Sequence, residues 1–111
     1  MRSFEIEYDG KTFNLTMTRE SIRYVEKTDG FNLNEATNIS SIYSLFFAAL
    51  RKNHPTINRA KADKMLDELT TPNANGEVEY GLDEIATCLG ELLKDCFANN
   101  EVVPKKSIKM I

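Results

Sequence analysis

The sequence has few cysteines and no surplus of basic residues, and each shortage excludes a class of protein. Its two cysteines, Cys88 and Cys96, lie within one predicted helix and are too far apart to form a disulfide bond. They also lack the C-x-x-C spacing and the histidine partner of a zinc site, so we expect them to be buried as small apolar side chains. Lysine and arginine number 14 against 17 aspartates and glutamates, a net charge of −3. A nucleic-acid partner is therefore not expected.

Long apolar runs are also missing. The longest candidate, IYSLFFAAL, has about half the length of a membrane span. The first ten residues, MRSFEIEYDG, are charged at once and never develop the apolar run of a signal peptide. With 111 residues, 41% hydrophobic and 28% charged, the chain is predicted to be one globular domain. We expect a soluble protein of the reducing cytoplasm, without a membrane partner.

Catalytic signatures are scarce. His54 is the only histidine, and no G-x-S-x-G-like sequence presents a nucleophile. We expect His54 to make a local hydrogen bond at the end of a helix. The carboxylates near the C-terminus (Asp83, Glu84, Glu91 and Asp95) are expected on the solvated face of the last helix rather than in a catalytic cleft. These observations predict a protein without enzymatic activity, catalytic residues or a cofactor.

The first 17 residues have the pattern of a β-hairpin. Phe4, Ile6 and Tyr8 alternate with polar residues, and a second alternating run carries Phe13, Leu15 and Met17. The Asp9-Gly10 pair between the runs is a strong hairpin signal, because both residues tolerate a positive φ. An isolated hairpin is marginal in water, so its apolar face is expected to pack on other elements.

From Thr18 onward the apolar period changes from two residues to about 3.6, which predicts helices. Thr18 is the expected N-cap of the first helix and Gly30 its end, with Phe31 and Leu33 turning back underneath. The next helix, rich in Leu and Phe up to His54-Pro55, is expected to be the central one. Two amphipathic helices follow, the first of them capped by Thr56 or Asn58 and the second running from about Leu82 to Phe97.

These elements predict an α+β fold in which an N-terminal hairpin packs on a small bundle of about four helices. Residues 1–98 are expected to form a single domain. Residues 99–111 show no clear period and are expected to be an extended or disordered tail.

The loop TPNANGEVEY, residues 71–80, partly resembles a calcium-binding loop. Aligned on Gly76, the first position is Thr71 and the twelfth is Leu82, where a calcium loop needs oxygen ligands and a bidentate glutamate. Asn73 and Asn75 cannot supply the missing negative charge. Pro72 and the Asn-Gly pair are also turn-forming residues. We therefore predict a turn and no metal site.

The order of the elements resembles a known family. Residues 3–98, and above all YDGKTFNLTMTRESIR and LFFAALRKNHP, are similar to the small phage and prophage proteins encoded among tail genes. These resemble the tail assembly chaperones of long-tailed phages of Gram-positive bacteria. The resemblance implies a non-enzymatic protein of the bacterial host cytoplasm. Its partner would be a helical segment of the tape-measure protein, which it would keep from aggregating. Loop 71–80 and its flanks are longer than in that family.

A helical partner docks through apolar anchors at helical spacing, and the stripes of the last two helices supply them. We predict Met65, Leu69, Leu89, Leu92 and Phe97 as partner-binding residues, presented singly or side by side in a homo-oligomer. The competing expectation is that all five are buried in the core.

Two other functions compete with the chaperone. The chain fits a small cytoplasmic adaptor or regulatory domain that binds one folded protein, or a calcium-responsive helix–loop–helix protein with a degenerate loop. A neighbouring gene for a very long helical protein would favour the chaperone over the adaptor. Thr71 and Leu82 disfavour the calcium protein.

Overall fold

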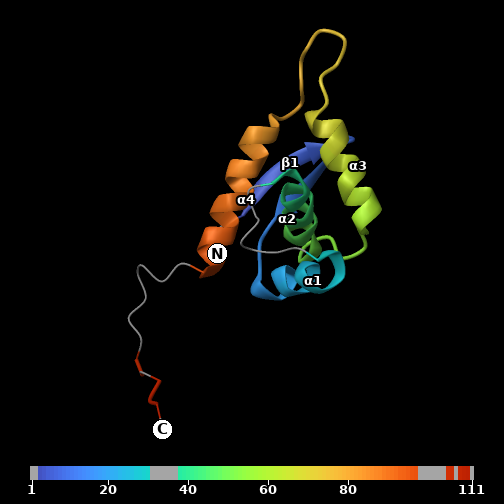
Figure 1. Ribbon diagram of the computed structural model, residues 1–111. Coiled ribbons are helices and arrows are strands. Elements are labelled where there is room, and N and C mark those ends of the chain that lie inside the picture. The colour runs from blue at the N-terminus through green and yellow to red at the C-terminus, as the bar shows by residue number, and fades with distance from the viewer. Residues whose placement is uncertain (1–2, 31–37, 98–104, 107, 111) are drawn as a thin grey trace.

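The computed structural model describes residues 3–30, 38–97, 105–106 and 108–110 (Figure 1). Two antiparallel strands precede four helices, which confirms the predicted α+β fold. In chain order the elements are β1 (Phe4–Tyr8), β2 (Lys11–Leu15), α1 (Arg19–Asp29), α2 (Ile39–Arg51), α3 (Arg59–Thr70) and α4 (Leu82–Phe97). Phe31, Leu33 and most of the predicted tail lie outside the described residues, so the predictions for them stay predictions.

The hairpin has the predicted two-residue turn. Asp9 and Gly10 both have positive φ, at 52° and 74°, as a tight turn between twisted strands requires. The register pairs Tyr8 with Lys11 and Ile6 with Phe13. Ile6 is buried on the face of the hairpin that meets the core, so the alternation in the sequence is confirmed.

The outer edge of β2 and the residue after it are covered by the end of α2 and the segment that follows it. The Asn14 backbone N–H donates to Nε2 of His54 at 3.0 Å, and the Thr16 backbone N–H donates to the Ala49 carbonyl at 2.9 Å. The His54 backbone N–H makes the predicted local bond, to the Leu50 carbonyl, but its ring joins a strand 40 residues away. Because Nε2 accepts this bond, the ring proton lies on Nδ1.

Helix α2 is the centre of the fold, as predicted. It packs against α1, α3, α4 and β2, and Figure 1 shows it surrounded by these elements. Every residue from Ser44 to Leu50 is buried, and Phe46 is the largest fully buried side chain. The helix ends at Arg51, slightly before the His54-Pro55 pair that was expected to end it.

The predicted helix caps are confirmed. Thr18 caps α1 and Gly30 ends it in the left-handed conformation, with φ of 67°. Asn58, one of the two expected candidates, caps α3 through a bond from the Lys61 backbone N–H at 2.8 Å. Thr18 takes part in a capping box, because its side chain accepts from the Ser21 N–H while the Ser21 hydroxyl accepts from the Thr18 N–H.

Thr18→Ala is expected to lower the free energy of unfolding by about 1 kcal/mol, within the usual 0.5 to 2 kcal/mol for a lost N-cap. The substitution leaves the first backbone N–H groups of α1 without the Thr18 acceptor. Urea denaturation measures the change. Thr28→Ala is the matched control, because the exposed Thr28 hydroxyl only donates back to the Tyr24 carbonyl within the helix. Equal losses for the two variants would contradict a specific capping role.

Candidate functional site

Four of the five predicted partner-binding residues lie in the hydrophobic core. Met65 and Leu69 on α3, and Leu89 and Leu92 on α4, are at most 2% exposed. In the folded domain these four side chains belong to one cluster of buried residues, as the competing expectation held for them. Phe97 alone remains accessible, at 43% exposed. The open surfaces of the domain therefore lie elsewhere.

One open surface is a groove beside α1 and the C-terminal end of α2, which we name the apolar groove. It consists of two hollows of about 470 and 280 Å³ that share Tyr24 and Arg51. The larger hollow is bordered by α1. The smaller continues over Phe47 to the connection between α2 and α3, where Pro55 and Ile57 line it. Apolar atoms predominate in the lining, as they do in many binding grooves.

The centre of the apolar groove is a stack of three side chains. The Arg51 guanidinium lies 3.6 Å from the centroid of the Tyr24 ring and 5.8 Å from that of Phe47. The two rings are tilted, with centroids 6.2 Å apart. Phe47 is buried and anchors the stack, whereas Tyr24 is 39% exposed. The cation–π contact holds the Arg51 guanidinium against the Tyr24 ring.

Sequence reasoning missed this site. Neither Arg51 nor Tyr24 was among the predicted partner-binding residues. A signal was present, because Tyr24 lies on a polar side of α1, with Glu20 four positions before it and Lys27 three positions after it. No apolar residue of α1 lies three or four positions away from Tyr24.

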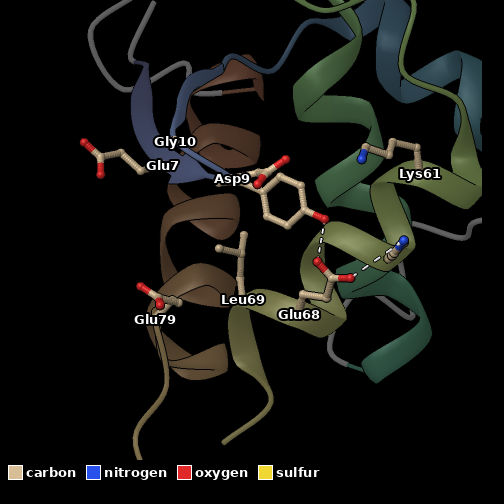
Figure 2. A pocket seen from close by; sticks show the side chains of 9 residues that line it. Glu7, Asp9, Gly10, Lys61, Glu68, Leu69 and Glu79 are labelled. Atoms are coloured by element: carbon tan, nitrogen blue, oxygen red, sulfur yellow. Dashed lines mark hydrogen bonds and ion pairs between the residues drawn. The ribbon is translucent and has the colours of Figure 1, made fainter. Parts of the chain in front are cut away.

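A second open surface lies between the hairpin turn and α3, and we name it the acidic groove (Figure 2). Two hollows of about 580 and 360 Å³ share Glu68 and Glu79. Together the linings contain five carboxylates and two lysines, a formal balance of −3. The charged residues are Glu7, Asp9, Glu68, Glu77 and Glu79, with Lys61 and Lys64.

The charges of the acidic groove are divided between its two sides. Glu68 accepts a hydrogen bond from the Tyr8 hydroxyl and lies 3.9 Å from the Lys64 ammonium group. The Lys61 ammonium lies 5.2 Å from the Tyr8 ring centroid. Figure 2 shows Glu7 and Glu79 on the side of the hairpin turn away from Lys61 and Glu68. Lys64 therefore lies beside Glu68 and Lys61 beside the Tyr8 ring, whereas Glu7 and Glu79 make the other side acidic.

The bond to Glu68 raises the pKa of Tyr8 to about 12, helped by partial desolvation and by the charges of Glu68 and Asp9. A bond from the Tyr43 hydroxyl to Asp67 raises the pKa of Tyr43 to about 12 in the same way. In both pairs the neutral phenol donates to a carboxylate, and ionisation would put two negative charges in contact. Both phenols thus hold α3 to neighbouring elements.

Titration of the phenol absorbance is expected to show two tyrosines that ionise near pH 12 in the folded protein and near pH 10 after unfolding. Since the folded pKa is the higher one, the stability from these bonds is complete below about pH 10. It is lost as the pH rises toward about 12. Tyr8→Phe and Tyr43→Phe should each remove one late-ionising group. Unfolding free energies that stay constant from about pH 9 to pH 11 would contradict this linkage.

The exposed end of α4 is attached to the start of α1. The Arg19 Nε–H donates to the Cys96 carbonyl at 3.0 Å, and the guanidinium lies 5.6 Å from the Phe97 ring centroid. The Cys96 thiol donates to the Met17 carbonyl. Cys88 and Cys96 are free and only half-buried, not fully buried as expected. Desolvation raises the pKa of both thiols, which disfavours the reactive thiolate.

A comparison with protein families adds one result. Residues 2–110 match the family described as Domain of unknown function (DUF5055). The chain belongs to this family. No curated protein and no solved structure shows significant similarity to it. The family description names no activity and no partner, so the resemblance to tail assembly chaperones stays a prediction.

Loop 71–80 of this family member is the predicted turn. The Asn73 N–H donates to the Glu77 carbonyl at 2.8 Å, and Gly76 has a φ of 77°. The Asn73 side-chain oxygen accepts from the backbone N–H groups of Asn75 and Glu77. Among the described residues, no group of three or more His, Cys, Asp and Glu is placed to hold a metal ion. The described helices include none that is long and apolar enough to cross a membrane.

Titration with millimolar calcium is expected to release no saturable heat and to leave Tm unchanged. The Asn73 oxygen is already used within the turn, and no glutamate closes the loop at Leu82. A Tm that rises with calcium concentration would contradict this, because an ion bound only to the folded state must stabilise it.

Proposed function

We propose that this protein is a non-enzymatic, tail-assembly-chaperone-like protein that binds a helical segment of a tape-measure protein in the bacterial host cytoplasm. The observation that carries the proposal is the Tyr24–Arg51 stack at the centre of the apolar groove. The resemblance of residues 3–98 to tail assembly chaperones supplies the class of partner.

The stack has the properties of a binding hot spot. Tyrosine and arginine are enriched among the residues that dominate binding energy, above all where neighbouring contacts exclude water. Arg51 is held against Tyr24 and Phe47 before binding, so little side-chain entropy remains to be lost. A partner side chain that covers the exposed part of Tyr24 buries apolar area without disturbing the core.

The groove also suits a helix rather than a flat surface. Its two hollows follow one another from α1 to the connection between α2 and α3, so successive turns of a helix can place one anchor in each. The rim carries both signs of charge, with Glu20 and Glu26 beside Arg23 and Lys27. Recognition would therefore rest on the apolar anchors more than on net charge.

Co-expression with the long helical tail protein encoded at the same locus tests the proposal. We expect that protein to become more soluble and to co-purify with the 111-residue chain. Tyr24→Ala and Arg51→Ala should each weaken binding by about 30-fold, the loss typical of a hot spot. Val78→Ala is the control, because Val78 is exposed to a similar extent, at 41%, but lies in loop 71–80.

Two other outcomes would change the conclusion. If the long protein is no more soluble with the chain and does not co-purify, the chaperone function fails and the adaptor for a folded protein takes its place. If it co-purifies equally well with Tyr24→Ala and Arg51→Ala, the function stands but the apolar groove is not the contact.

A further inference from the structure

The C-terminal segment exposes apolar side chains that the domain does not cover. Ile108 and Met110 are fully exposed, at 102% and 100%. They alternate with Lys109, a period-2 pattern that in an extended chain places both on one side. The last eight residues, PKKSIKMI, contain three lysines and no acidic residue. The segment is therefore both basic and apolar.

The acidic groove is complementary to this segment in charge. Glu7, Asp9 and Glu79 have no ion-pair partner among the residues that the structure describes. The segments that carry Glu7 and Glu79 are far apart in sequence but close in space, because the Glu7 backbone N–H donates to the Tyr80 hydroxyl at 2.9 Å. The Tyr8 ring lines the same hollow as Glu7, Asp9 and Glu79, and Val78, which is 41% exposed, lines the second hollow with Glu79.

The geometry disfavours binding of the segment within its own chain. Helix α4 begins beside the acidic groove, next to Tyr80, and ends at Phe97 beside Arg19 and Met17. Its 16 residues span about 24 Å. The link from Phe97 to Lys105 covers about 29 Å at most, so it would have to be mostly extended to bring Lys105 back. In Figure 1 the described C-terminal residues lie beyond the Phe97 end of α4, away from the groove.

We infer that the acidic groove of one copy binds the basic C-terminal segment of a second copy. Lys105, Lys106 and Lys109 face the carboxylates of Glu7, Asp9 and Glu79. Ile108 and Met110 cover the Tyr8 ring and Val78. Mutual exchange of two segments closes a dimer, whereas one-way exchange builds a chain of copies. The apolar groove takes no part, so this inference and the proposed function can fail separately.

Sedimentation equilibrium of the full chain, from about 10 to about 500 μM, tests the inference. We expect the average mass to rise with concentration and to fall in about 1 M NaCl, where charge attraction is screened. The triple reversal Lys105→Glu, Lys106→Glu and Lys109→Glu should weaken association by at least about tenfold. The groove reversal Glu7→Lys, Asp9→Lys and Glu79→Lys should do the same. An equimolar mixture of the two variants should associate again, because each supplies the complementary charge to the other.

Two further variants keep the result interpretable. Lys27→Glu, Lys52→Glu and Lys94→Glu reverse the same number of charges elsewhere and should leave association nearly unchanged. Ile108→Ser with Met110→Ser alters no charge and should also weaken association. If the groove reversal does not fold, the double serine variant and the lysine reversal of the segment still test whether the segment mediates association. A wild-type chain that stays monomeric at every concentration overturns the inference. The inference also fails if the segment variants weaken association no more than the control variant does.

Discussion

Phe46→Ala is expected to lower the free energy of unfolding by about 3 to 5 kcal/mol, the usual cost of removing a buried aromatic ring. Phe46 is fully buried on α2, the helix that contacts α1, α3, α4 and β2. Truncation leaves a cavity at the point where these elements meet, and the surrounding side chains can fill it only in part. Urea denaturation should show a lower midpoint at a similar slope.

The control for this prediction is Phe97→Ala. The same atoms are removed, but Phe97 is 43% exposed at the end of α4, where the Arg19 guanidinium lies 5.6 Å from its ring centroid. We expect a loss of about 1 kcal/mol, as for an ordinary substitution outside the core. If Phe46→Ala costs no more than Phe97→Ala, the central position of α2 in the core is wrong.

Leu89→Ala is expected to lower the free energy of unfolding by about 2 to 5 kcal/mol, because Leu89 is fully buried on α4. Its effect on partner binding should be small at temperatures where the variant is folded. Leu89 reaches neither hollow of the apolar groove, so its loss changes stability and not the binding surface. Thermal unfolding and binding to the helical partner, measured on one sample, separate the two effects.

Tyr24→Ala is the matched comparison and should show the opposite behaviour. Tyr24 is partly exposed in the apolar groove, so its loss should weaken binding far more than stability. If folded Leu89→Ala loses the partner while Tyr24→Ala retains it, the stripe on α4 is the contact after all. The domain would then have to open in order to bind.

The two grooves depend on different elements of the fold. The apolar groove depends on Arg51, whose position follows from the end of α2 and from the buried Phe47 ring. The acidic groove depends on the hairpin turn, which the bond from Tyr8 to Glu68 holds against α3.

The sequence alone determined the elements and most of their ends. The Asp9-Gly10 turn, the Thr18 cap, the Gly30 end and the bounds of α4 were predicted correctly. Each depends on residues within a few positions of one another. Turn conformations, N-caps and apolar periods are local interactions, so their signals are present in short stretches of sequence.

Only the tertiary structure decided which surfaces remain open. The apolar stripes of α3 and α4 have the same sequence pattern whether another helix of the domain covers them or a partner protein does. Met65 and Leu89 are buried in the core because α2 packs against both α3 and α4, which no local pattern records. The contacts that build the grooves join distant residues, as Tyr8 joins Glu68 across 60 positions. Such contacts depend on how all elements pack at once, and for that reason the Tyr24–Arg51 stack and the acidic groove were seen only in the folded chain.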